Sequence, residues 1–318
     1  MRASNCCVAV FLLAMAGCPR DIFCSDSSVG RDLLTVVAKY AYFVLPSEGP
    51  WFQTPPFRDA SLSNFGRVAT VYGPAGTVSV SAAGASSAEN SLEIGAVSAT
   101  WSNACDLLAV VTRGAAGDRV VIMTDELKTE VEIPVNLPAA DDGSPYKRFV
   151  ISWSADDRLV AVSTDAIRND NPSPSWPDNL RAVPLCLFID WRAGGIRSTH
   201  ELHNVYFIGS DTVVGTPPTD SVTETAEAMF NVHRFALSGD QLQDQGLVHG
   251  AGFAVGSHPS SGVFVTVDEV APLVEFNPRY VRDRVTDGGC RVVRSANAED
   301  KILVAERAPI ADLIPEGF

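Results

Sequence analysis

The sequence has few charged residues, and basic residues are the scarcer kind. Charged residues make up 19% of the 318 positions, and 24 Lys and Arg stand against 38 Asp and Glu, which gives a formal net charge of -14. A protein that binds a nucleic acid needs basic groups to neutralise the phosphates. We therefore expect no nucleic acid partner. Hydrophobic residues make up 46% of the chain, which indicates a globular fold rather than disorder.

Sequence signatures of the common catalytic and cofactor sites are also lacking. The chain contains no Gly-x-Ser-x-Gly elbow, no Walker loop, no Cys-x-x-Cys pair and no calcium-loop pattern. The glycines of HGAGFAVGSH (249–258) miss the spacing of a dinucleotide-binding loop by one residue, and no helical pattern follows them. We expect no cofactor, and we treat an enzyme as the alternative to a binding protein.

Long hydrophobic runs are absent, and the one apolar segment at the N-terminus is too short to span a bilayer comfortably. A single positive charge, Arg2, precedes the run CCVAVFLLAMAG, which ends at Met15-Ala16-Gly17-Cys18. A short apolar run behind a positive charge and closed by small residues is typical of an export signal.

The small residues before Cys18 resemble the lipobox of bacterial lipoproteins. In that family the signal is cleaved before the cysteine, which then carries lipid. The resemblance implies a signal peptide over residues 1–17, a lipid on Cys18, a linker over 18–31 and a membrane anchor in the cell envelope. Cleavage after Ala16, in an A-x-A pattern, is the alternative and would release a free exported protein.

The cysteines are few and irregularly spaced. If the signal is removed, four remain besides Cys18, namely Cys24, Cys105, Cys186 and Cys290. Their spacing gives neither a disulfide framework nor a metal pattern. We expect buried thiols, although pairing in an oxidising compartment stays open.

One phrase recurs along the chain. ISWSADDRLVAVS (151–163) aligns without a gap on ATWSNACDLLAVV (99–111), so that Trp153 matches Trp101 at a distance of about fifty residues. The same frame gives six apolar anchors, at Val68, Leu107, Leu159, Val213, Val263 and Ile302. Short runs rich in Val, Ile and Phe, bounded by Gly, Pro, Asp and Ser, predict strands. The fold class is therefore all-β, built from repeated units of four strands.

Each unit can be divided into strands. An apolar segment ends in a polar turn, an apolar run such as LVAVST follows, and a third strand (VVIMT at 120–124, LCLFID at 185–190) leads through a turn to a weaker outer strand, TEVEIPV at 129–135. Trp101 and Trp153 end the first strand and are expected to fill the wedge between neighbouring units. Only residues 221–230 could form a short helix.

These units resemble the blades of TolB-type or WD-repeat-like β-propellers. Blades of that family carry a serine and a polar turn, commonly Ser-Pro-Asp-Gly, where this chain has Ser154-Ala155-Asp156-Asp157 and Ser102-Asn103-Ala104-Cys105. The resemblance implies a β-propeller domain over residues 32–318 and is silent about function, because propellers perform many tasks.

Six anchors predict six blades. The sixth would take its inner strands from residues 290–309, and the run LLTVVAKYAYFVL (33–45) would supply its outer strands and close the ring. A five-bladed ring with extra strands, or an incomplete domain that needs a partner chain, is the alternative.

All five histidines fall between positions 200 and 258. His203, His249 and His258 are weak candidates for a metal site at the mouth of the central channel, although HELHN is not the H-E-x-x-H of metalloproteases. Asp156 and Asp157 lie in a turn, where aspartate favours hydrogen bonds to the local backbone over calcium binding.

Two long insertions, 165–183 and 216–228, fall between the second and third strands of successive units, and such loops leave a propeller on one face. The first contains Trp176, a possible apolar anchor at an interface, and we predict that it binds a partner together with Asn171, Asp178 and Arg181. We thus expect an exported, lipid-anchored binding or scaffold protein of the envelope, whose partner is a protein or another envelope component.

Overall fold

The computed structural model describes residues 57–62, 67–82, 88–115, 117–138, 149–164, 183–218, 232–248, 253–259, 262–267, 290–296 and 299–304. In these residues the regular structure consists of 20 strands, which are joined by turns. The strands are β1 (Phe57–Leu62), β2 (Arg67–Tyr72), β3 (Thr77–Ala82), β4 (Asn90–Glu93), β5 (Ala96–Trp101), β6 (Leu107–Thr112), β7 (Asp118–Thr124), β8 (Thr129–Val135), β9 (Phe149–Trp153), β10 (Leu159–Thr164), β11 (Cys186–Asp190), β12 (Gly195–His200), β13 (His203–Phe207), β14 (Thr212–Thr216), β15 (His233–Ser238), β16 (Gln241–Leu247), β17 (Phe253–His258), β18 (Val263–Val267), β19 (Cys290–Ala296) and β20 (Glu299–Val304).

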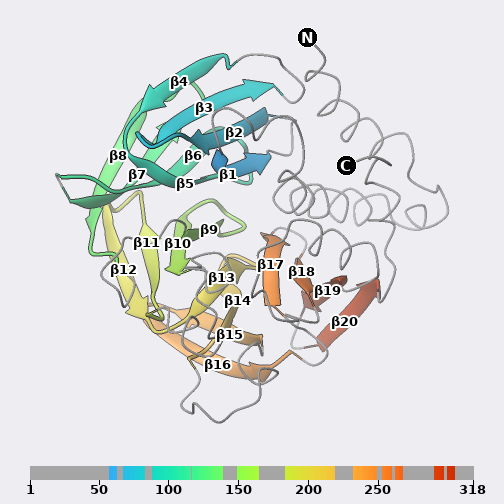
Figure 1. Ribbon diagram of the computed structural model, residues 1–318. Coiled ribbons are helices and arrows are strands. Elements are labelled where there is room, and N and C mark those ends of the chain that lie inside the picture. The colour runs from blue at the N-terminus through green and yellow to red at the C-terminus, as the bar shows by residue number, and fades with distance from the viewer. Residues whose placement is uncertain are drawn as a thin grey trace, which may run out of the picture.

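The strands form five antiparallel units of four, each made from consecutive strands. β1–β4, β5–β8 and β17–β20 are separate sheets, whereas β9–β12 and β13–β16 are joined by one parallel pair, Thr164 with His203. We number these units 1 to 5 in chain order. Figure 1 shows them arranged around a common centre, with the first strand of each unit towards the centre and the fourth at the rim. The all-β fold with four-stranded units is confirmed, and its radial arrangement is that of β-propeller blades.

The predicted strand order within a unit is also confirmed. The expected outer strand 129–135 is β8, and the expected third strands around 120–124 and 185–190 are β7 and β11. Val68, Leu107, Leu159, Val213 and Val263 all lie in the second strand of a unit.

The placement of the sixth anchor was wrong. Ile302 lies in β20, and β20 pairs with β19, which pairs with β18, so residues 290–304 complete unit 5 instead of starting a sixth. A hairpin of strands 3 and 4 has the same pattern of apolar runs around a turn as a hairpin of strands 1 and 2, which explains the error. Unit 5 therefore needs no strands from residues 33–45, which lie outside the described part of the chain, as does the possible helix 221–230.

The core lies between the units, in four apolar clusters. Trp101 packs with residues of units 1 and 2 such as Val71 and Leu108, and Trp153 packs with residues of units 2 and 3 such as Val111. Both indoles are only 2% exposed. Two further clusters join unit 3 to unit 4 around Phe188 and Phe207, and unit 4 to unit 5 around Phe264. The expectation that the tryptophans fill the wedges between units is confirmed.

Buried serines add polar links at three of these boundaries. Ser61 accepts a hydrogen bond from the Trp101 amide at 3.3 Å, and Ser98 accepts one from the Phe149 amide at 2.8 Å. Ser152 does the same for the Phe207 amide at 2.9 Å. Each bond joins the first strand of one unit to the first strand of the next, which satisfies amides that would otherwise be buried without an acceptor.

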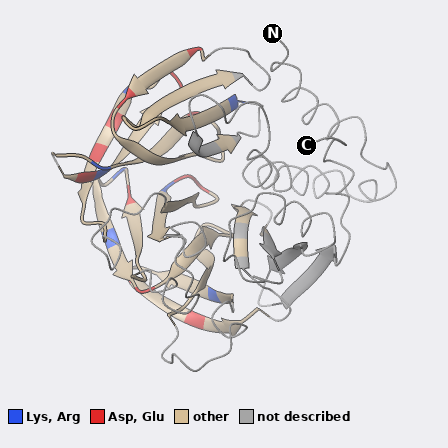
Figure 2. Cartoon of the chain, viewed as in Figure 1, with Lys and Arg blue, Asp and Glu red and all other residues tan. Residues whose placement is uncertain are grey.

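Acidic side chains gather on the outer strands, as the red segments of Figure 2 show along β4, β8 and β16. Glu93, Glu130, Glu132 and Asp244 belong to these strands. A rim of charge suits a surface in contact with water. In the portion that the structure describes, no helix has the length and apolar character needed to cross a membrane.

Candidate functional site

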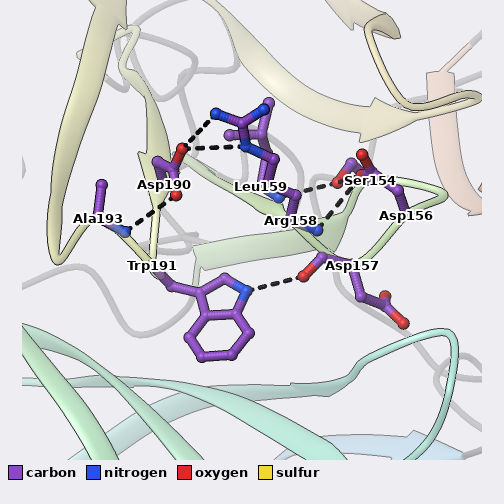
Figure 3. Close-up of polar contacts among 8 residues, drawn as sticks. All are labelled: Ser154, Asp156, Asp157, Arg158, Leu159, Asp190, Trp191 and Ala193. Carbon is purple, nitrogen blue, oxygen red and sulfur yellow. Dashed lines mark hydrogen bonds and ion pairs between the residues drawn. The ribbon is translucent and has the colours of Figure 1, made fainter.

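The turn between β9 and β10 is organised by its own serine and aspartate. Ser154 Oγ donates to Asp156 Oδ1 at 2.7 Å and accepts from the Leu159 amide at 2.9 Å (Figure 3). The equivalent Ser102 bonds Asp106 and the Leu107 amide in unit 2. The repeated serine of the two phrases therefore has a structural reason, since its hydroxyl closes the turn that starts the second strand.

A second pair of contacts ties this turn to the hairpin of β11 and β12. The Arg158 guanidinium bonds Asp190 Oδ2 through Nε at 3.1 Å and through Nη2 at 3.0 Å, and Trp191 Nε1 donates to the Asp157 carbonyl at 2.7 Å (Figure 3). Asp190 Oδ1 accepts from the Ala193 amide at 3.1 Å. Burial acts to raise the pKa of Asp190, but the bonds from Ala193 and Arg158 outweigh it and hold this pKa below its ordinary value.

Asp157 joins the turn of unit 3 to the corresponding turn of unit 2. Its Oδ1 accepts from the Asn103 amide and from Asn103 Nδ2, both at 2.8 Å, and its Oδ2 accepts from the Ala104 amide at 2.8 Å. Asn103 Nδ2 also donates to the Ser154 carbonyl at 2.6 Å. We call this set of bonds the boundary clamp. Burial raises the pKa of Asp157 above its ordinary value, although the bonds from Asn103 and Ala104 oppose the shift.

The backbone of these turns has a conformation that glycine adopts most readily. Asp157 has a φ of 51° and its counterpart Cys105 a φ of 61°, both in the left-handed region. Aspartate tolerates this region better than most residues, so Asp157 can hold the turn and also supply the carboxylate of the boundary clamp.

Asp156, Asp157 and Asp190 all accept hydrogen bonds from other groups of the chain. The expectation of bonds to the local backbone is confirmed for Asp156, whose Oδ1 accepts from the Arg158 amide at 3.3 Å. It is wrong for the Asp157 side chain, which bonds residues 103 and 104 of the preceding unit instead. Among the residues that the structure describes, no three His, Cys, Asp or Glu side chains are grouped closely enough to hold a metal ion.

The opposite edge of the units carries the long connections. Second strands end and third strands begin there, at Thr164 and Cys186 in unit 3, at Thr216 and His233 in unit 4, and at Val267 and Cys290 in unit 5. We call this edge the loop face. The two insertions found in the sequence both belong to it, and residues 268–289 make a third long connection at the same position, which the sequence reasoning missed. In units 1 and 2 the corresponding links, 73–76 and 113–117, are short.

His203 lies at this face, at the start of β13. Its Nδ1 is 2.8 Å from Thr164 Oγ1, which also accepts a hydrogen bond from the Leu185 amide at 3.3 Å. The side chain is 8% exposed, and burial lowers the pKa of His203 to about 4. The ring is therefore neutral at pH 7. One ring nitrogen then carries the proton and the other is an acceptor, and the Thr164 hydroxyl, which can both donate and accept, satisfies Nδ1 in either tautomer.

The described part of the structure does not place the other two candidate metal ligands, His249 and His258, beside His203. His258 closes β17 beside the turn to β18, where it pairs with Val263, whereas His203 lies at the open end of the corresponding hairpin, paired with Thr216. His249 lies outside the described residues. The predicted partner-binding residues Trp176, Asn171, Asp178 and Arg181 and the lipidation site Cys18 also lie outside them, so these assignments stay predictions.

Cys105 and Cys186 are buried thiols and form no disulfide. Burial raises the pKa of the Cys186 thiol, so this group is unreactive at neutral pH. Cys290 lies in β19, and Cys24 lies outside the described residues. For Cys105 and Cys186 the prediction of buried thiols is confirmed.

The sequence matches no protein-family model and no curated protein. Solved structures that are similar to the chain include hydrazine synthase of Kuenenia stuttgartiensis, at 13% identity and a TM-score of 0.44, with 78% of this chain and 83% of that chain covered. The β-propeller domain of the Trilobed protease from Pyrococcus furiosus matches at 11% identity and a TM-score of 0.47, over 77% of this chain and 70% of that one.

Acylaminoacyl peptidase of Pyrococcus horikoshii matches at 12% identity and a TM-score of 0.47, over 80% of this chain and only 40% of the peptidase. Likeness at this level says nothing of activity. The four-stranded units and their radial order are seen in the chain itself.

Proposed function

We propose that this chain is an exported, lipid-anchored β-propeller that binds a protein or another envelope component through its loop face. The observation that carries the proposal is the position of the three long connections. All three link the second strand to the third in consecutive units, so they leave one side of a scaffold whose clusters hold neighbouring units together. Loops held by a rigid framework are the usual place for recognition in such folds.

Within the proposal the five described units are blades of the ring, and the blade count is five unless residues 1–56 add to it. The N-terminal segment directs the chain to the cell envelope, where residues 1–17 are removed and lipid is attached to Cys18. The insertion 165–183 supplies the recognition surface, with Trp176 as apolar anchor and Asn171, Asp178 and Arg181 as polar contacts. An aromatic anchor with polar neighbours is a common composition for an interface.

The anchor is tested by expressing the full chain in a bacterial envelope with an alkyne analogue of palmitate, followed by intact mass. We expect a mature chain that begins at Cys18, carries lipid and enters the detergent phase on partition. The Cys18→Ser variant should lose both the label and the detergent partition. A mature chain that begins at Gly17 and carries no lipid would contradict the anchor and leave a free exported protein.

The binding face is tested separately, with a photo-crosslinking amino acid at position 176 in cells that express the chain. The matched control carries the same amino acid at position 196, because Ile196 is 42% exposed on the outer strand β12, away from the loop face. We expect a discrete crosslinked product at position 176 that is absent at 196. Equal crosslinking at both positions, or none at 176, would contradict the loop face as the recognition surface.

A further inference from the structure

Two hydroxyl groups of the described chain are hydrogen-bonded to histidine rings, and they differ in exposure. The first pair, Thr164 with His203, is buried and serves the junction of β10 and β13. The second pair lies on the outer strand β12, where Ser198 Oγ is 3.0 Å from His200 Nε2. Both residues of this second pair are half-buried, so water and small molecules can reach them. His200 pairs with Cys186 at the loop-face edge of unit 3, and Ser198 pairs with Phe188 further along β12.

The His200 ring is held by groups from two units. Phe188 of unit 3 contacts it edge-on, with ring centroids 5.7 Å apart and planes at 65°. Asp240, in the β15–β16 turn of unit 4, lies near enough to favour the protonated form of the ring. Nε2 is the ring nitrogen that faces Ser198 Oγ. In the tautomer with its proton on Nδ1, Nε2 has a lone pair towards the serine hydroxyl.

We propose that Ser198 is a nucleophilic serine, with His200 as its general base and the Phe188 ring as the group that holds the imidazole in place. A serine hydroxyl, an imidazole within hydrogen-bond distance and a third group that orients the imidazole are the parts that nucleophilic catalysis requires. The substrate class is a small carboxylic ester with a good leaving group, such as an aryl ester, since a positioned base contributes only about 10²–10⁴-fold by itself.

The proposed reaction is acyl transfer. Ser198 Oγ attacks the ester carbonyl while its proton passes to His200 Nε2, the bond to the leaving oxygen breaks, and the imidazolium returns the proton to that oxygen. The products are an acyl-serine and a phenol. Water then attacks the acyl-serine by the same route, with His200 as the base, and releases the carboxylic acid and Ser198.

The electrostatic state of His200 suits this role. Burial lowers the pKa of His200, although the bond and the charge of Asp240 oppose the shift, so the ring is neutral at pH 7 and can accept a proton. His203 has the same kind of hydroxyl partner but is 8% exposed, which closes it to a substrate. Exposure therefore distinguishes the pair that can react from the pair that is structural. The site uses none of the residues that we propose for partner binding in the insertion 165–183, so either proposal can fail without the other.

The test is covalent labelling of the purified full chain with a fluorophosphonate, which forms a serine–phosphonate ester and releases fluoride, followed by peptide mass mapping. We expect Ser198 to be labelled faster than the other serines. His200→Gln keeps an amide that can bond Ser198 but cannot act as a base, and it should slow labelling by about 100-fold, the lower end of general-base contributions. Ser198→Ala should abolish the label at this peptide.

Thr199→Ala is the matched control, because Thr199 is exposed, lies between the two residues and is not part of the pair. It should label at the wild-type rate, and circular dichroism should show that every variant is folded. The rate of labelling should also fall in acid, where His200 becomes protonated and cannot act as a base, and it should stay constant above neutral pH. Labelling of Ser198 no faster than of other exposed serines, or an equal rate in His200→Gln, would overturn the proposal.

Discussion

At the scale of single residues, His203 shows how burial makes an ionisable group part of stability. The pKa of its ring is about 4 in the folded chain, against 6.5 for an exposed histidine. The unfolded chain therefore binds the proton more tightly than the folded chain. The contribution of His203 to the free energy of unfolding is fully present above pH 6.5 and is lost as the pH falls from 6.5 through 4. The loss from this group amounts to about 3 kcal/mol, at about 1.4 kcal/mol for each unit of pKa.

We therefore predict that His203→Gln removes this part of the acid sensitivity. The free energy of unfolding, measured with urea at pH 7 and at pH 4, should fall by about 3 kcal/mol less in the variant than in the wild type. Thr199→Ala, at an exposed position of an outer strand, should keep the wild-type difference between the two pH values. The same pH dependence in His203→Gln and the wild type would show that the ring is not shielded from water.

The clamp between Asn103 and Asp157 shows what residue-level reasoning cannot reach. Sequence analysis predicted correctly that the turn 154–157 is polar and that Asp156 bonds the local backbone. It could not predict that the Asp157 side chain bonds the preceding turn, because that contact depends on how unit 3 is rotated against unit 2. A signal was present, since Asn103 and Asp157 both have side chains that can bond backbone groups.

At the scale of elements, the turn from β2 to β3 shows how tightly neighbouring units approach. Gly73 and Gly76 both lie in this turn and both have a left-handed φ, of 68° and 64°. A Cβ on Gly76 would lie 2.3 Å from the Ala96 amide nitrogen and 2.5 Å from its carbonyl oxygen, whereas a Cβ on Gly73 would meet nothing within 4 Å. The Gly76 carbonyl accepts the Ala96 amide at 2.9 Å, so unit 2 rests directly on this turn.

We predict that Gly76→Ala destabilises the chain much more than Gly73→Ala. Both pay the cost of a side chain in the left-handed region, about 1–2 kcal/mol. Gly76→Ala must also displace backbone of unit 2, which adds about 1–3 kcal/mol or more. Chemical denaturation of both variants measures the difference. Equal losses would mean that the approach of the two units is looser than the structure shows.

Elements also explain which parts of the fold could be predicted. Strand pattern and turn residues are local, and they gave the correct order of strands inside a unit, including β8 and the positions of the two insertions. The assignment of residues 290–304 failed because pairing with β18 is not local. The connection 268–289 is long enough to hold a hairpin of its own, so the sequence allowed residues 290–304 to begin a new unit. The pairing of β18 with β19 shows that these residues continue unit 5.

At the scale of the whole molecule, the units are linked in chain order by clusters and by single polar contacts. The boundary of units 2 and 3 has three such contacts, from Ser98 to the Phe149 amide, from Trp153 Nε1 to the Thr100 carbonyl at 3.1 Å, and the clamp of Asn103 and Asp157. Every described unit buries its apolar faces against its neighbours. Such a chain should unfold in one cooperative transition as long as the free energy of interaction across each boundary exceeds the difference in stability between the units that it joins.

Weakening one boundary should break this cooperativity. Ser98→Ala leaves the buried Phe149 amide without its acceptor and should cost about 1–3 kcal/mol. Asn103→Ala removes the side-chain bonds of the clamp but leaves Asp157 the backbone amides of residues 103 and 104, and it should cost about 0.5–1.5 kcal/mol. We predict that the double variant, in which both losses fall on the boundary of units 2 and 3, unfolds in two steps. The fluorescence of the 5 Trp, of which Trp153 lies at that boundary, should then begin to change at a lower urea concentration than the far-UV circular dichroism of all the strands.

The control places two comparable losses at different boundaries. Ser61→Ala affects units 1 and 2 and Ser152→Ala affects units 3 and 4, because their hydroxyls accept the amides of Trp101 and Phe207. That double variant should be destabilised by the sum of its single losses and still unfold with coincident fluorescence and dichroism, since no boundary has lost two contacts. Coincident transitions in both double variants would place the cooperativity in the apolar clusters alone. Separate transitions only in the Ser98→Ala and Asn103→Ala pair would show that polar contacts between the inner strands and turns hold neighbouring units together.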